Sequence, residues 1–119
     1  MAGSVNTPKK AQARFYRSLG GKEPVRDWLK SLDEADRRII GYDIATLEYG
    51  WPIGMPVCRP MGDGLFEVRS NLKDGRIARV LFATKKGVIV LLHGFVKKTQ
   101  KTPMEELALA RKRMKELEP

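Results

Sequence analysis

The sequence predicts an α+β domain in which an antiparallel sheet of three to four strands follows an N-terminal helical hairpin and precedes a C-terminal helix. Residues 62–101 carry three strand-like runs separated by glycine-containing turns, which is typical of a meander. Apolar residues recur at helical spacing on both sides of this stretch. The length of 119 residues fits a single domain, residues 1–119, in which residues 1–9 form a flexible basic leader.

The first half of the chain is predicted to be mainly helical. Residues 11–19 form a short strand, which we expect at an edge of the later sheet. Residues 31–34, SLDE, have the form of a capping box and start a second helix that ends at Gly50. Proline and glycine make residues 51–60 a loop. Pro24 suits the start of the first helix, whose apolar stripe is Val25, Trp28, Leu29 and Leu32.

The sheet is predicted from three segments and two turns. Residues 65–71 alternate, and Lys73-Asp74-Gly75 is a strong hairpin signal because Asp-Gly supplies the positive φ of a tight turn. Residues 76–84 form the next strand, and Lys85-Lys86-Gly87 turns the chain again. Residues 88–95 form the third strand, and its continuous apolar run, residues 88–92, makes us expect a strand that is buried on both faces and therefore central.

The last helix is predicted to begin near residue 102. Thr102 is the expected N-cap, Pro103 the first helical residue, and Glu105 the acidic residue of the first turn. The apolar stripe that would face the sheet consists of Leu107, Ala110, Met114 and Leu117. The predicted order is therefore β-α-α-β-β-β-α.

The charge of the chain indicates a polyanionic partner. The formal net charge is +9 and the isoelectric point is near 9.9. Residues 59–101 hold ten Lys or Arg against three acids, so the excess is concentrated in the predicted sheet. Such an excess favours contact with nucleic acid or with an acidic protein.

Several classes of function lack their motifs in the sequence. There is no P-loop, no Rossmann glycine fingerprint and no Ser-His-Asp candidate, and the acids do not cluster as metal ligands. We therefore expect no cofactor and no metal. Cys58 is the single cysteine and cannot form an internal disulfide, and no apolar run is long enough for a signal peptide or a membrane span. These features favour the cytoplasm and no membrane partner.

Two arginines are the first candidates for a site. Counted back from the turn at residues 73–75, Arg69 and Arg79 lie roughly opposite each other on neighbouring strands. Like charges placed opposite each other destabilise a sheet by up to ~1 kcal/mol, so an anion bound between them would explain the pair. The alternative is that Glu67 or Asp74 neutralises one of the two arginines.

A second candidate group lies at the end of the last strand. His93 can accept or donate a proton near neutral pH, or it can be a hydrogen-bonded residue at the sheet edge. Lys97, Lys98 and Lys101 follow it and are placed to hold phosphate, although they also fit an exposed basic loop before a helix.

These segments resemble a known family. The stretches GLFEVR (residues 64–69), RVLF (79–82) and above all VLLHGFVKKTQKTP (90–103) are similar to the phage-derived, HigB-like branch of the RelE/ParE toxin superfamily. The last helix, with Glu105-Glu106, Ala108 and Arg111, resembles the ending of the same family. The resemblance covers nearly the whole domain and implies a RelE-like fold.

The resemblance implies the toxin of a type II toxin–antitoxin system, a metal-independent endoribonuclease that cleaves mRNA in the ribosome. The 2′-OH of the RNA would attack the adjacent phosphate and leave a 2′,3′-cyclic phosphate. The partners it implies are a helix-turn-helix antitoxin, the ribosome and mRNA. By this resemblance Arg79 contacts the scissile phosphate, with Arg69, His93, Lys97 and Lys98 as further catalytic candidates. The basic residues Lys73, Arg76 and Lys101 are the candidates for RNA binding. The RelE tyrosine near the last helix is missing, so His93 or Lys101 would take its place.

Two other functions fit the same pattern. ParE-type relatives share the fold, so the chain could act as a non-enzymatic toxin that binds DNA gyrase. A degenerate module that only binds an antitoxin is the third alternative. The basic, His-containing strand end favours the nuclease, because a binding toxin does not require it.

Overall fold

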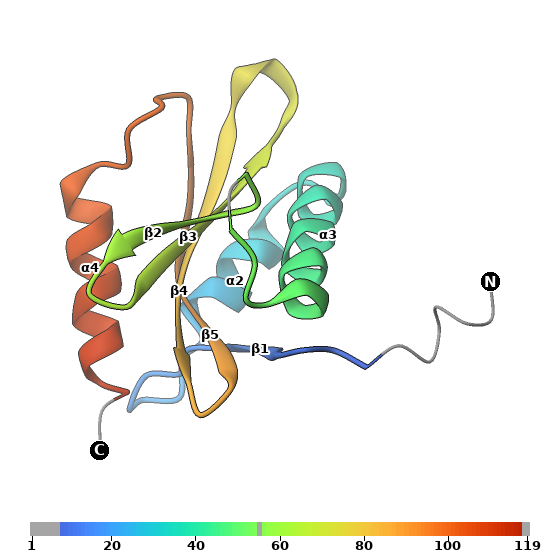
Figure 1. Cartoon of the computed structure of the whole chain (residues 1–119). Helices are drawn as coiled ribbons and strands as arrows, with labels where there is room; N and C mark the ends of the chain where they lie inside the picture. Colours follow the sequence, from blue (N-terminus) through green and yellow to red (C-terminus); the bar gives the residue numbers. More distant parts are fainter. Residues whose placement is uncertain (1–7, 55, 118–119) are drawn as a thin grey trace.

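The computed structural model describes residues 8–54 and 56–117, so the expected leader lies largely outside the described residues (Figure 1). The strands are β1 (Gln12–Phe15), β2 (Cys58–Gly62), β3 (Leu65–Asn71), β4 (Ile77–Lys85) and β5 (Val88–Lys97). The helices are α2 (Pro24–Ser31), α3 (Glu34–Gly50) and α4 (Met104–Lys115), and a short 3-10 turn spans Lys73–Gly75. The predicted order of helices and strands is therefore observed, with β2 as an addition.

The sheet has five strands in the order β1-β5-β4-β3-β2 and is mixed, because β1 runs parallel to β5. The predicted antiparallel sheet of three to four strands is therefore wrong. β2 was missed because Pro60 lies within it, and an edge strand tolerates proline since one side of its backbone has no strand to bond. The direction of β1 depends on its long connection through α2 and α3, which an alternating pattern does not encode.

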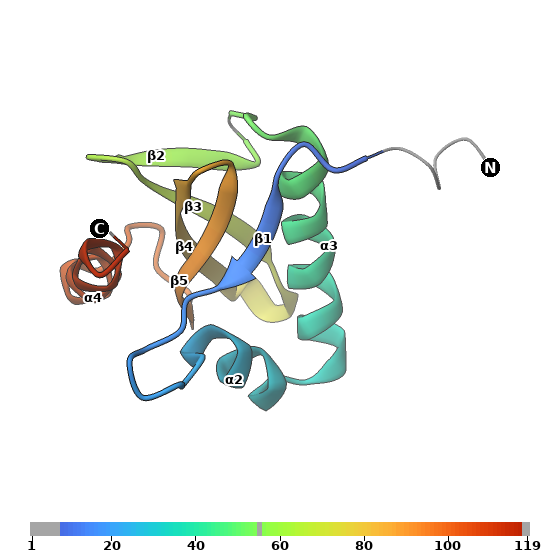
Figure 2. The ribbon, with the colours of Figure 1, turned by 90° about the horizontal axis from the view of Figure 1, so that it is seen from below.

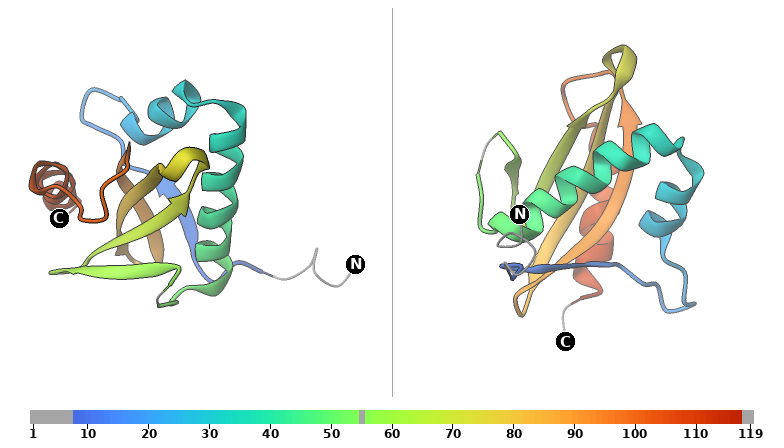
Figure 3. Two further views of the ribbon diagram at one scale, coloured as in Figure 1. Left: turned by 90° about the horizontal axis from the view of Figure 1, so that it is seen from above. Right: turned by 90° about the vertical axis from the view of Figure 1, so that its right-hand side faces the viewer.

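The predicted N-terminal helical hairpin is also wrong. β1 comes first, as predicted, but α2 and α3 run in clearly different directions in two views and so do not pair as a hairpin (Figures 2 and 3). α2 packs against β5, whereas α3 packs mainly against β3. The capping box is absent, since the Ser31 hydroxyl donates to the carbonyl of Trp28 and the N-cap of α3 is Asp33. Two extended residues, Leu32 and Asp33, turn the chain between the helices.

Helices cover both faces of the sheet, with α2 and α3 on one face and α4 on the other (Figure 3). The first face buries Val25, Ile40 and Leu47 against Val68, Val80 and Phe82. The α4 face buries Leu65, Leu81, Leu92 and Ala110. β5 is paired on both sides, but the middle strand is β4, in which every residue from Ile77 to Ala83 is buried.

Both predicted turns are confirmed. Asp74 and Gly75 have φ values of 62° and 73°, and Lys86 and Gly87 have values of 51° and 80°. The first turn fixes the register of β3 against β4, and this register determines which side chains share the α4 face.

Candidate active site

The register places Arg69 directly opposite Arg79, as predicted. Glu67 lies beside them on the same face, and its carboxylate is 2.7 Å from Arg69 Nε and 3.9 Å from Arg79 Nε. Glu67 and Arg79 are both 0% exposed. The alternative in which Glu67 pairs with an arginine is therefore observed. The Glu67 carboxylate accepts a hydrogen bond from Arg69, whereas Arg79 Nε is too far away for one.

The segment Thr99–Thr102, called the strap below, closes over this cluster between β5 and α4. The Arg79 guanidinium donates through Nη2 to the carbonyl of Thr99, and Arg69 Nη2 donates to the carbonyl of Gln100 at 2.5 Å. The Thr102 hydroxyl donates to Glu67 Oε2. Thr102 is therefore a partner of Glu67, whereas the N-cap of α4 is Pro103, so the predicted N-cap is wrong. Two backbone carbonyl oxygens occupy positions where the arginines could bind an anion.

Arg79 retains unused hydrogen-bond donors. Its Nε and Nη1 atoms are buried and have no hydrogen-bond partner within residues 8–54 and 56–117. The ring of Phe95 lies under the guanidinium, 5.7 Å from its carbon, and supplies a cation–π contact. Burial, and then the nearby charge of Arg69, lower the pKa of Arg79. A buried guanidinium with free donors is the chemistry of an anion receptor.

His93 and Lys97 form a second cluster on the same face. Both contact the carboxylate of Glu106 in the first turn of α4, with His93 Nε2 at 2.5 Å and Lys97 Nζ at 3.3 Å. The imidazole also stacks on Phe95, with ring centroids 5.6 Å apart. Phe95 therefore touches both clusters, because its ring contacts Arg79 as well as His93.

The remaining predicted residues lie at one end of the sheet. Figure 1 shows the strap and the β3–β4 turn at this same end. Lys98 is exposed next to the strap, Lys101 is exposed within it, and Lys73 is exposed in the turn. Arg76 is held by Asp36 through two hydrogen bonds of 2.8 and 3.0 Å, so its guanidinium ties the turn to α3.

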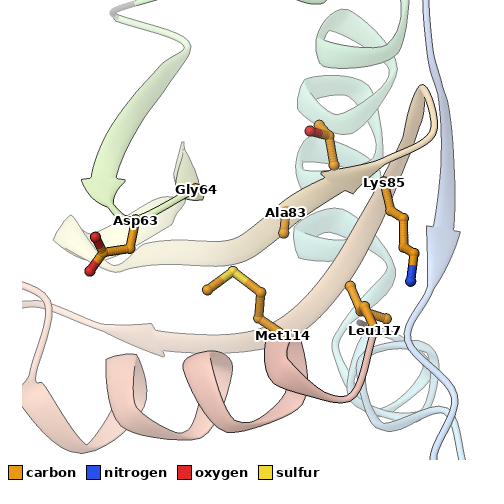
Figure 4. Close-up of a pocket in the computed structure, with 7 residues that line it drawn as sticks. Asp63, Gly64, Ala83, Lys85, Met114 and Leu117 are labelled. Atoms are coloured by element: carbon orange, nitrogen blue, oxygen red, sulfur yellow. The ribbon is translucent and has the colours of Figure 1, made fainter. Parts of the chain in front are cut away.

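The apolar pocket in Figure 4 is separate from these clusters. It encloses about 300 Å³ near the C-terminal end of α4, and none of the candidate catalytic residues lines it. Its lining combines apolar side chains with one lysine and one acid: Ala83, Met114, Leu117, Gly64, Thr84, Lys85 and Asp63. It offers no group of converging polar atoms for chemistry.

The part of the chain that the structure describes holds neither a cluster of metal ligands nor a membrane-spanning helix. Within it, no three His, Cys, Asp or Glu side chains lie close enough together to hold a metal ion. None of the described helices combines the length and the apolar character that a membrane crossing requires.

The chain matches a known protein family over most of its length. Residues 27–115, about three quarters of its length, match the family described as "Phage derived protein Gp49-like (DUF891)". The chain belongs to this family. The Gp49-like family is associated with the RelE/HigB-like toxins of toxin–antitoxin systems, so membership implies an antitoxin partner. A search of curated proteins finds no match.

The part of the chain that matches the Gp49-like family contains all candidate site residues but excludes β1. It also contains three residues that the sequence reasoning did not assign to the site: Glu67, Thr102 and Glu106. Glu67 was predicted only as a residue that could neutralise an arginine, although its i, i+2 spacing to Arg69 places both on one face of a strand. Thr102 and Glu106 carry no such signal, since their contacts depend on how the strap folds back onto the sheet.

Proposed function

We propose that this Gp49-like protein is the toxin of a type II toxin–antitoxin system, and that it acts in the cytoplasm as a metal-independent endoribonuclease on mRNA in the ribosome. Its proposed interaction partners are a helix-turn-helix antitoxin, the ribosome and mRNA. The observation that supports the proposal best is the buried guanidinium of Arg79, which lies opposite Arg69 and retains two unused donors.

The reaction needs positive charge at the phosphate. The RNA 2′-oxygen bonds to phosphorus, the bond to the 5′-oxygen breaks, and the products carry a 2′,3′-cyclic phosphate and a 5′-hydroxyl. Arg79 and Arg69 stabilise the charge that develops on the phosphate oxygens, and removal of one such donor costs about 10²–10³ in rate. His93 and Lys97 exchange the protons of the attacking and leaving oxygens.

The strap must move for this chemistry, because Arg79 is closed from solvent. The carbonyl oxygens of Thr99 and Gln100 accept from the same guanidinium groups that would bind the phosphate. Phosphate oxygens thus replace these carbonyls when the strap opens, and they also reach the free Arg79 donors. Lys98, Lys101 and Lys73 then contact the RNA backbone around the opened site, while Arg76 holds the turn that carries Lys73.

The decisive experiment compares Arg79→Met with Arg38→Met. Methionine fills the volume of a buried arginine without its charge, and such replacements of buried ions often preserve the fold. Arg38 is a suitable control because its side chain is 76% exposed and, among the described residues, forms an ion pair only with Glu34 on the same helix. Each variant is induced in a bacterial host, and mRNA is mapped for new ends, with parallel reactions on purified RNA with and without ribosomes.

We expect induced wild type and Arg38→Met to arrest growth and to leave mRNA fragments with 2′,3′-cyclic phosphate ends. Arg79→Met should retain the circular dichroism spectrum of the wild type and lose about 10²–10³ in cleavage rate. Growth arrest with intact mRNA, or full cleavage by folded Arg79→Met, would refute the proposal. Inhibition of gyrase supercoiling without RNA cleavage would favour the ParE-like alternative instead.

A further inference from the structure

One carboxylate joins the two proton-carrying residues of the proposed site. Glu106 Oε1 lies 2.5 Å from His93 Nε2, and Glu106 Oε2 lies 3.3 Å from Lys97 Nζ. The exposed fractions of these side chains are 17% for Glu106, 15% for His93 and 38% for Lys97. Both oxygens of the carboxylate are therefore engaged, one by the His93 imidazole and the other by the Lys97 ammonium group.

The position of Glu106 is fixed by the packing of α4. Leu107 and Ala110, which follow it on the helix, pack into the core on this face of the sheet. A carboxylate that is largely removed from water has to be paired. Burial opposes its ionisation, but the hydrogen bonds from His93 and Lys97 outweigh burial and hold the pKa of Glu106 below its usual range. The carboxylate is therefore an ionised acceptor at neutral pH.

An ionised acceptor determines which nitrogen of a neutral imidazole carries the proton. Since Glu106 accepts from Nε2, the His93 ring holds its proton there and presents Nδ1 as a lone-pair nitrogen. No other residue in the described ranges hydrogen-bonds to Nδ1, and the stack on Phe95 fixes the plane of the ring. Lys97 is different, because an ammonium group has only protons to donate.

We infer that Glu106 is a positioning residue that orients His93 as the base, through Nδ1, and Lys97 as the acid. This inference rests on the proposed function. Nδ1 takes the proton of the 2′-hydroxyl as the 2′-oxygen bonds to phosphorus, and Lys97 gives a proton to the 5′-oxygen as its bond to phosphorus breaks. Glu106 stabilises the imidazolium that forms, in the manner of the carboxylate in a catalytic triad. Solvent then returns a proton from His93 to Lys97.

His93 is the one histidine of the chain, so the ring-nitrogen NMR signals of ¹⁵N-labelled protein are unambiguous. In the neutral ring we expect Nε2 to be protonated in the wild type, and a mixture of both tautomers in Glu106→Ala. Glu105→Ala is the matched control, because Glu105 is exposed on the same turn of α4. Glu106→Asp withdraws the carboxylate by one methylene and should also lose the fixed tautomer, so it replaces the alanine variant if that variant does not fold.

RNA cleavage supplies the second readout. Glu106→Ala should lower kcat by about 10²-fold with little change in KM, since the residue does not touch RNA, and Glu105→Ala should match the wild type. Glu106→Gln should restore the tautomer and part of kcat, because its amide oxygen also accepts from Nε2. An unchanged tautomer in Glu106→Ala overturns the inference, and so does an altered tautomer with unchanged kcat. If wild type leaves RNA intact, the proposed function fails, and the NMR result alone decides whether Glu106 fixes His93.

Discussion

The substitution Gly94→Ala tests how the strand that carries His93 is supported from the opposite face of the sheet. Gly94 lies between His93 and Phe95 in β5, and the indole of Trp28 from α2 packs directly over it. A Cβ atom added at this position would lie 2.3 Å from Cζ3 and 2.4 Å from Cε3 of Trp28. Carbon atoms normally approach to about 3.5–4.0 Å, so the indole would have to move by about 1 Å or more.

The size of the effect follows from two opposing contributions. Overpacking a core costs about 1–3 kcal/mol, and a clash with a large ring this close to the backbone belongs at the upper end. Replacing glycine in a strand by alanine returns about 0.5–1 kcal/mol. We therefore expect a loss of about 2 kcal/mol in the free energy of unfolding, which for a domain of this size lowers Tm by roughly 8 °C.

Gly41→Ala provides the matched control. Gly41 is exposed in the middle of α3, and a Cβ added there meets no atom within 4 Å. The same chemical change should therefore raise the free energy of unfolding by about 0.5–1 kcal/mol, because alanine is the better helix former. Opposite signs for the two variants in thermal and urea unfolding would establish that the clash, and not the added methyl group, is responsible.

The reasoning fails if Gly94→Ala unfolds at the wild-type temperature. A double-mutant cycle with Trp28→Leu makes the test more specific, because leucine leaves room for the added methyl group. The cost of Gly94→Ala should be clearly smaller in the Trp28→Leu background. An equal cost in both backgrounds would show that Trp28 is not the group that excludes a side chain at position 94.

Two further predictions concern ionisable groups. Hydrogen bonds from Arg76 hold the pKa of Asp36 below its usual range, so the ionised pair stabilises the fold above about pH 4, and this contribution is lost as the pH falls through the lowered pKa. Arg76→Met should therefore be less stable than wild type in urea near pH 7, with a difference that shrinks near about pH 2; a difference independent of pH would contradict this. Burial raises the pKa of Cys58 from its ordinary value of 9.0 to about 11, and the residue is 3% exposed. Its reaction with an aromatic disulfide reagent should be at least about 100-fold slower in the folded protein than in urea, and equal rates would refute the burial argument.

Local signals in the sequence predicted the parts of the fold that depend on near neighbours. The two glycine turns required a positive φ, and the first of them fixed the register that sets Arg69 opposite Arg79. The apolar spacing predicted each helix, because residues three and four positions apart share one face of a helix. The direction of β1 and the existence of β2 depend on pairing between distant segments, and no local pattern specifies it.

The candidate site divides in the same way. The arginine pair was predictable because both residues belong to one hairpin. The partners that complete the site come from the strap and from α4, and Thr102 lies 35 residues from Glu67 in the sequence. The sequence also did not reveal that Arg79 is closed from solvent, because the position of the Thr99 carbonyl that accepts from it depends on how the strap folds back onto the sheet.

The hydrogen bonds at Arg79 bear on the proposed opening of the strap. Closing supplies one carbonyl to Arg79 and one to Arg69, and hydrogen bonds from charged donors contribute about 1.5–3 kcal/mol each. Closing also leaves Nε and Nη1 of Arg79 unpaired in the interior, at a cost of the same order. A phosphate would restore both carbonyl contacts in a stronger, charge-assisted form and would fill the unpaired donors as well. The closed strap therefore leaves the arginines less completely hydrogen-bonded than a phosphodiester would in the proposed reaction.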